Sequence, residues 1–179
     1  MVKNWPKLSP RFPWVTLVLF LLCSAAKLLH SGLSVPAQLT MMELAGMLPI
    51  QVAAIFSRPV MARPDYQLLT LFSALFVHAS WLHFVGNMVY LWVFGIPLER
   101  RLGWFGMLAV FMFGGALANL IVAFRLPELA TPIVGARSAV SAVIGAYLGL
   151  LLASRIGMLL PLGLILQFAC VPAVLVIGS

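Results

Sequence analysis

The residues best suited to chemistry in this sequence are His78, His83 and Asn87, which stand in an otherwise apolar stretch. Polar side chains at membrane depth are costly and rarely face lipid, so these three are expected to point into a helix bundle or a hydrated cavity. His83 and Asn87 are four residues apart and therefore share one face of a helix, one turn apart. Ser80 stands where the N-cap of that helix is expected. The stretch predicts a small polar site.

Two other interpretations of this stretch stay open on local chemistry. Histidine and asparagine in membrane helices often only hydrogen-bond to a neighbouring helix, which contributes roughly 0.6 to 2 kcal/mol each. A histidine pair can also bind a metal, but His78 and His83 are five residues apart rather than the three or four that share a helix face. The spacing therefore favours His83 and Asn87 as a pair of hydrogen-bond donors rather than a metal site.

The composition is that of a multi-pass membrane protein. Apolar residues make up 63% of the 179 residues and charged residues 8%, and the mean hydropathy is +1.11, which excludes an ordinary soluble domain. The net charge of +7 is therefore interpreted through loop positions, and no nucleic acid partner is expected. Cys23 and Cys170 both lie in apolar runs and are expected to be packing residues rather than a disulfide.

The chain is expected to form a single membrane domain, 1–179, that starts with a basic inner tail, 1–11, and a first membrane helix, 12–32. A signal peptide is the alternative, because a basic start and a short apolar core precede Ser24-Ala-Ala26. A lipoprotein signal is disfavoured, since the residue before Cys23 is a leucine. A retained first helix is the preferred interpretation.

The region 33–79 contains several prolines and charged residues and is expected to be a loop, partly embedded in the membrane. Its apolar part, Leu44 to Ser57, is too short to cross a bilayer and indicates an interfacial or re-entrant segment. The remainder, 80–179, is expected to hold helices two to five, at Ser80–Leu98, Leu102–Phe124, Gly135–Ser154 and Ile156–Ser179. The predicted fold class is all-α, a polytopic membrane helix bundle of about five membrane helices.

Basic residues favour an N-terminus on the inner, cytoplasmic side. The inner segments carry Lys3, Lys7, Arg11, Arg100, Arg101 and Arg155, against Lys27, Arg58, Arg63 and Arg125 outside. The second and fourth helices then both enter from outside, so that His83, Asn87 and the helix start at Gly135 are expected to meet at similar depth.

Four motifs together resemble the rhomboid family of intramembrane serine proteases. They are His78-x4-His83-x3-Asn87, Leu98-Glu-Arg-Arg-Leu-Gly103, Pro132-Ile-Val-Gly135 and Ala139-Val-Ser-Ala-Val-Ile-Gly-Ala-Tyr147. The resemblance covers roughly Leu68 to the end of the chain. It implies a rhomboid-like bundle that hydrolyses peptide bonds in or near the membrane helices of single-span proteins, without metal or cofactor. The expected location is a bacterial-type plasma (inner) membrane, with the N-terminus cytoplasmic.

The resemblance implies roles for the polar residues of these motifs. His83 and Asn87 would donate hydrogen bonds to an oxyanion, assisted by backbone N–H groups at the helix start that Gly135 begins. His78 would be structural and tie its loop to the bundle. Glu99, Arg101 and Gly103 would hold the inner turn together.

The motif that should carry the nucleophile is altered. Gly135-Ala-Arg-Ser138 places Arg137 where the family has its serine, and arginine stays protonated and cannot attack a carbonyl. Ser138 is one residue along, which rotates its side chain by about 100°. Ser141 is one turn deeper than Arg137. Ser138 is the candidate nucleophile if the altered motif is active, although packing is the expected role of both serines.

The family's general base, a histidine on a sixth helix, has no counterpart here, because the last histidine is His83 and the chain ends at Ser179. His30 lies by the first helix instead. We therefore expect a shortened or substituted rhomboid endopeptidase, impaired or inactive, with reduced stability or homodimerisation as a consequence. The alternatives are a non-catalytic relative that binds membrane helices and, less favoured for want of internal repeats, a small transporter component.

Overall fold

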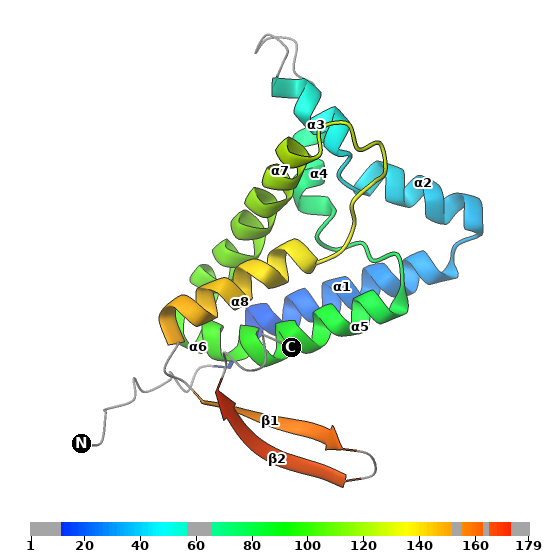
Figure 1. Ribbon diagram of the computed structural model, residues 1–179. Helices are drawn as coiled ribbons and strands as arrows, with labels where there is room; N and C mark the ends of the chain where they lie inside the picture. Colours follow the sequence, from blue (N-terminus) through cyan, green and yellow to red (C-terminus); the bar gives the residue numbers. More distant parts are fainter. Residues whose placement is uncertain (1–11, 57–65, 152–154, 163–164, 173–179) are drawn as a thin grey trace.

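The computed structural model describes residues 12–56, 66–151, 155–162 and 165–172, with side chains described as far as Leu150 (Figure 1). Helices dominate the described part of the chain, and two strands follow them. The elements in chain order are α1 (Trp14–Gly32), α2 (Val35–Ala45), α3 (Pro49–Phe56), α4 (Tyr66–Ser73), α5 (Trp81–Tyr90), the π-helical η2 (Leu91–Gly95), α6 (Ile96–Ala109), the π-helical η3 (Val110–Gly114), α7 (Gly115–Arg125), α8 (Arg137–Leu151), β1 (Arg155–Leu162) and β2 (Ile165–Pro172).

Two continuous helical segments are long and apolar enough to cross a bilayer. One is α1, with 19 residues, and the other is the 45-residue run Trp81–Arg125. A straight helix of that second length would measure about 68 Å, roughly twice the hydrocarbon thickness of a membrane. The chain instead turns at Gly103, whose φ of 78° and ψ of 173° belong to a region essentially restricted to glycine. The run is therefore two helices that meet at Gly103, near the predicted boundary between the second and third membrane helices.

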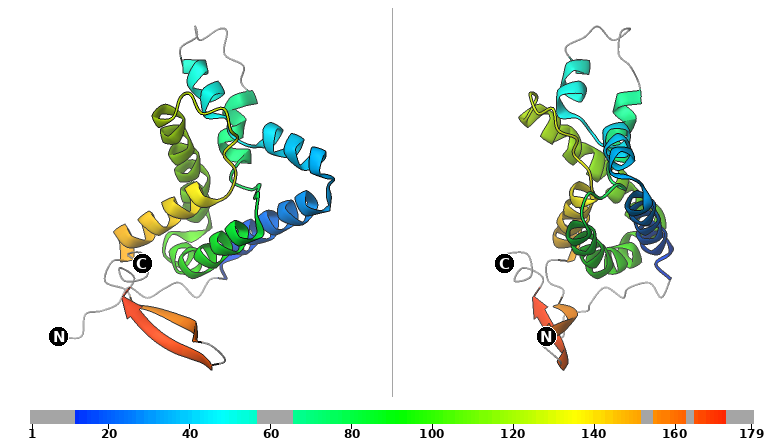
Figure 2. Two further views of the ribbon diagram at one scale, coloured as in Figure 1. Left: turned by 45° about the vertical axis from the view of Figure 1, so that its right-hand side comes forward. Right: turned by 90° about the vertical axis from the view of Figure 1, so that its right-hand side faces the viewer.

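The helices pack around a core of aromatic and aliphatic side chains. α1 packs against η2 and α6, which continue α5, and α8 packs against α7 and the π-helical segments (Figures 1 and 2). The fully buried side chains at this centre include Cys23, Leu75, Phe94, Phe111 and Val143. Cys23 carries a free thiol there. The helical fold class predicted from hydropathy is confirmed at this level.

The predicted fifth helix, Ile156–Ser179, is wrong where the chain is described. β1 and β2 form an antiparallel pair whose register runs from Arg155 opposite Pro172 to Leu162 opposite Ile165. Pro161 has no N–H and disfavours a helix interior, and a short apolar run bounded by proline and glycine cannot be assigned to helix or strand by periodicity alone. Residues 173–179, the remainder of that prediction, lie outside the described residues.

The loop predicted at 33–79 contains three short helices, α2, α3 and α4, and no helix long enough to span in its described part. A backbone pair fastens it to the segment before α8: the N–H of Met47 donates to the Ile133 carbonyl over 3.0 Å, and the N–H of Ile133 donates to the Met47 carbonyl over 2.8 Å. The loop thereby fixes the position at which α8 begins.

Glu99 joins α6 to the start of α1. Pro13 at the N-cap of α1 has no side chain that can accept a hydrogen bond, so the first N–H groups need an outside partner. The Glu99 carboxylate accepts from the Val15 N–H at 2.9 Å, and from the Thr16 N–H and hydroxyl at 2.7 Å each. A buried anion at a helix N-terminus also interacts favourably with the helix dipole. This contact joins the start of α1 to α6.

Candidate functional site

The helix that carries His83 and Asn87 begins at the predicted cap. The side chain of Ser80 accepts a hydrogen bond from the His83 N–H at 3.2 Å, and its extended backbone leads directly into α5. His83 and Asn87 then lie one turn apart on the side of α5 that also presents the buried Phe84 and Met88. The sequence therefore places both polar side chains toward the bundle.

His83 and Asn87 both have hydrogen-bonding atoms that the fold leaves unused. Asn87 is only 6% exposed, yet its Nδ2 has no partner. The Nε2 of the half-buried His83 is also buried without a partner. In the described part of the chain, the other buried side-chain nitrogen or oxygen atoms without a hydrogen-bond partner are the two ring nitrogens of His30. Buried polar groups are normally satisfied, so an unsatisfied pair on one helix face requires an explanation.

Gly135 brings the start of α8 against the His83 ring. Its φ is +113°, and a Cβ at this position would lie 2.7 Å from Cε1 of His83. Its N–H donates to the Ala74 carbonyl at 2.8 Å, which holds the backbone in place. Both the backbone conformation and the lack of space therefore require glycine here.

His78 connects the loop before α5 to the same helix start. Its Nδ1 lies 3.0 Å from the Phe76 carbonyl, and its Nε2 accepts from the Ala136 N–H at 3.3 Å. These two contacts require the neutral ring with its hydrogen on Nδ1. Burial lowers the pKa of His78 to about 4, with smaller lowering contributions from His83 and Lys27, opposed by the Phe76 contact. The Ala136 N–H at the start of α8 is therefore already hydrogen-bonded to His78.

Lys27 of α1 holds this loop from the other side. Its Nζ donates to the carbonyls of His78 and Ala79, at 3.1 Å each, and lies 5.2 Å from the centre of the Trp81 ring. Lys27 is 3% exposed, so its charge is compensated by these oxygens and by the aromatic face. From the sequence, Lys27 was counted only among the outer basic residues, and its contacts with this loop were not predicted. A lysine inside a long apolar run was the available signal.

The residues at the altered motif point in different directions. Arg137, the first residue of α8, is exposed, as is Ser141 one turn later. Ser138 is half-buried, and its hydroxyl donates to Oδ1 of Asn119 at 2.6 Å. Asn119 in turn donates from Nδ2 to the Leu71 carbonyl at 2.9 Å. Ser138 is therefore held toward α7, whereas His83 belongs to α5.

Asn119 was missed from the sequence, although a lone amide in the apolar α7 was a usable signal. The remaining predicted residues, Glu99, Arg101 and Gly103, lie at the far end of the second helix. Glu99 is sixteen residues after His83, about 24 Å along a helix. Arg101 is exposed and Glu99 is buried in its contact with α1. These three residues are therefore separate from the pair of donors.

Asn87 can donate a hydrogen bond to a carbonyl or oxyanion, and so can His83 in the tautomer that carries its hydrogen on Nε2. Two positioned side-chain donors in a protected site are the usual means of stabilising such an oxygen. Ser138 is not activated as a nucleophile. Its hydroxyl donates a hydrogen bond to an amide oxygen, which is too weak a base to take its proton. No group of three side chains able to hold a metal ion occurs among the described residues.

Comparison with known proteins matches the chain to a family model and to a curated relative. The family model, described as "Rhomboid domain", matches residues 65–179. "Rhomboid-like protein 11, chloroplastic" from Arabidopsis thaliana is 40% identical over 75 residues, which amount to 42% of this chain and 25% of the relative. The chain therefore matches about a quarter of the length of that relative.

Proposed function

The chain belongs to the rhomboid family, and on this premise we propose that it binds membrane segments of other proteins at the His83 and Asn87 site. In this proposal the chain is a catalytically impaired member of a class of intramembrane serine endopeptidases. The family membership and the apolar helices indicate a membrane protein. In the proposed arrangement the chain is multi-pass in a bacterial-type plasma membrane, the N-terminus is cytoplasmic, and the two donors lie in the outer half of the bilayer.

The observation that carries the proposal is the pair of unsatisfied donors. Nε2 of His83 and Nδ2 of Asn87 are buried without partners. Each unmade hydrogen bond of this kind costs about 1–3 kcal/mol, which a bound peptide carbonyl would recover. Gly135 holds the start of α8 directly against the His83 ring, so this helix start lies beside the unsatisfied histidine. A peptide carbonyl is the ligand that this donor pair fits.

The impairment follows from two neighbouring residues. Arg137 stands where the family resemblance puts the nucleophile, and a guanidinium is neither a nucleophile nor a base at physiological pH. Ser138 directs its hydroxyl to Asn119 of α7. A peptide carbonyl polarised by His83 and Asn87 would therefore meet no activated serine from this motif. Binding without efficient hydrolysis is the expected outcome.

The proposal is tested by photocrosslinking in vesicles. A single-span model protein with a photoreactive residue in its membrane segment is reconstituted with the chain, and the crosslinked complex is quantified over a concentration series. We expect the double substitution His83→Ala with Asn87→Ala to weaken apparent binding by about thirtyfold or more, at about 1 kcal/mol or more per lost hydrogen bond. Val85→Ala, on the exposed side of the same helix, is the matched control and should bind like the unaltered chain. Equal crosslinking by the double variant would contradict the proposal.

A further inference from the structure

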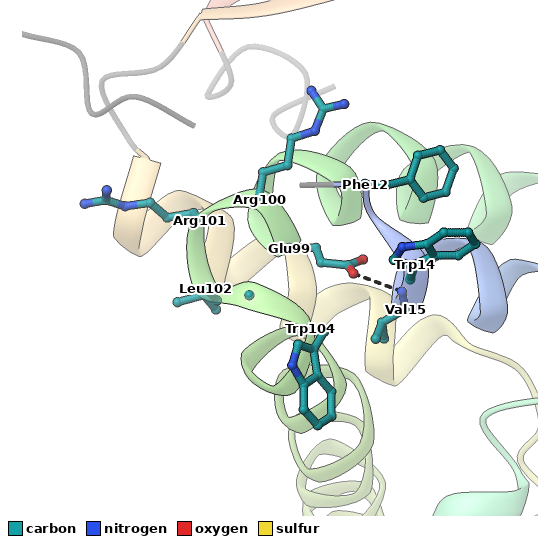
Figure 3. A pocket seen from close by; sticks show the side chains of 9 residues that line it. Phe12, Trp14, Val15, Glu99, Arg100, Arg101, Leu102 and Trp104 are labelled. Carbon is teal, nitrogen blue, oxygen red and sulfur yellow. Dashed lines mark hydrogen bonds between the residues drawn. The ribbon is translucent and has the colours of Figure 1, made fainter. Parts of the chain in front are cut away.

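A cleft of about 780 Å³ lies between the start of α1 and the turn within α6, at the end of the second helix remote from His83. Phe12 and Trp14 contribute one wall, Arg100 and Arg101 lie on the α6 side, and Trp104 follows the turn at Gly103 (Figure 3). Two membrane helices meet at this turn, so the cleft is expected at a membrane surface. The proposed function makes no use of it.

The charge of the cleft is positive and uncompensated within the described residues. Glu99 is the acidic residue of the lining, but its carboxylate is occupied by the N–H groups of Val15 and Thr16 and by the Thr16 hydroxyl. Arg100 and Arg101 are exposed, and Figure 3 shows both extending outward from α6 without a partner among the residues drawn. The two guanidinium groups are therefore available to an anion.

The walls of the cleft are aromatic and exposed. Trp14 is 64% exposed, Trp104 is 62% exposed and Phe12 is 56% exposed. The rings of Phe12 and Trp14 are in contact, with centroids 4.6 Å apart. Exposed aromatic rings beside arginines are typical of the level of the lipid headgroups, where an apolar surface and a charged group are needed together. The cleft thus combines an apolar wall for acyl chains with cations for a phosphate.

We propose that this cleft binds an anionic phospholipid, whose phosphodiester oxygens pair with Arg100 and Arg101 while its acyl chains run along Trp14 and Trp104. A second copy of the chain is a poor occupant, because a symmetric contact would bring the same arginines together. The chain's own residues 1–11 lack complementary charge, since they contain Lys3, Lys7 and Arg11 and no acid. This inference is independent of the peptide site at His83 and Asn87.

The test is a lipid titration of the purified full chain in a neutral detergent, followed by native mass spectrometry. Phosphatidylglycerol is compared with phosphatidylcholine of the same acyl chains. We expect tighter binding of phosphatidylglycerol, and a loss of about 25-fold in its affinity when Arg100→Gln and Arg101→Gln are combined, at about fivefold per arginine. Arg125→Gln, which removes a cation from the last turn of α7, is the matched control and should leave the affinity unchanged.

Other outcomes would overturn the proposal. Equal binding of both lipids, or an equal loss in the Arg125→Gln variant, would show that no specific cleft is involved. Displacement of phosphatidylglycerol by millimolar inorganic phosphate would show a site for a free anion rather than a lipid.

Trp104→Ala provides an independent check, because it should weaken phosphatidylglycerol binding while both arginines remain. Unchanged thermal unfolding of the arginine variant would show that a lost affinity is not a lost fold.

Discussion

His78 is a titratable link between three elements, and acidification should break it. In the folded protein the neutral ring accepts from the Ala136 N–H and contacts the Phe76 carbonyl, and burial holds its pKa at about 4. The unfolded chain has an ordinary histidine pKa near 6.5 and takes up a proton below that value. The stability that His78 contributes is therefore complete above pH 6.5 and is lost as the pH falls toward 4.

The size of the effect follows from that difference in pKa, which corresponds to about 3 kcal/mol. For a chain of this length, such a loss lowers the midpoint of thermal unfolding by roughly 6–12 °C. The charged groups that face His78 act in the same direction: Lys27 is bonded to the His78 carbonyl, and the His83 ring lies 5.9 Å away, centre to centre. A protonated His78 would be repelled by both.

The assay is thermal unfolding of the purified protein in a non-ionic detergent between pH 8 and pH 4.5. His78→Gln is the matched variant, because its side-chain oxygen can still accept from Ala136 but does not titrate. We expect this variant to be less stable than the unaltered chain at pH 8 by about 1 kcal/mol, and to lose less stability on acidification. Identical pH profiles for the two proteins would refute the reasoning.

Three further substitutions test contacts and a backbone conformation that stabilise the fold, all by thermal unfolding in detergent. Glu99→Gln should destabilise by about 2 kcal/mol, because the N-terminus of α1 loses its charged acceptor, whereas Glu43→Gln on the exposed side of α2 should be neutral. Gly103→Ala should cost about 1–3 kcal/mol from backbone strain alone, since a Cβ there has open space; Gly32→Ala, equally open, is the control. Asn119→Leu should cost about 1–3 kcal/mol by leaving its two partners unsatisfied, and equal stability would contradict the assigned bonds.

Hydropathy and local spacing were sufficient to predict most of the helical part of the fold. The apolar run that became α1, the cap at Ser80 and the shared face of His83 and Asn87 depend on neighbours within a few residues in the chain. Helix formation and capping are local, so a sequence contains the necessary information. The segment from Ile156 failed for the same reason, because a short apolar run does not distinguish a spanning helix from a pair of strands.

The partners of the polar residues could not be predicted, because they come from distant parts of the chain. Lys27 donates hydrogen bonds to carbonyls more than fifty residues away, and Ser138 of α8 is hydrogen-bonded to Asn119 of α7. The sequence placed Ser138 one position from the expected nucleophile, but only the packing of α8 on α7 gave its hydroxyl a fixed partner. The rotation of a helix about its axis is set by such contacts and is not visible in hydropathy.

The most direct test of the central claim is cleavage of a single-span model substrate in vesicles by the unaltered chain and by Ser138→Ala. Crosslinking in the same vesicles first establishes that the substrate is bound. The account predicts that the two proteins give the same background, with no cleavage that depends on Ser138. Cleavage by the unaltered chain that disappears with Ser138→Ala would contradict it and would make Ser138 the nucleophile of an active protease.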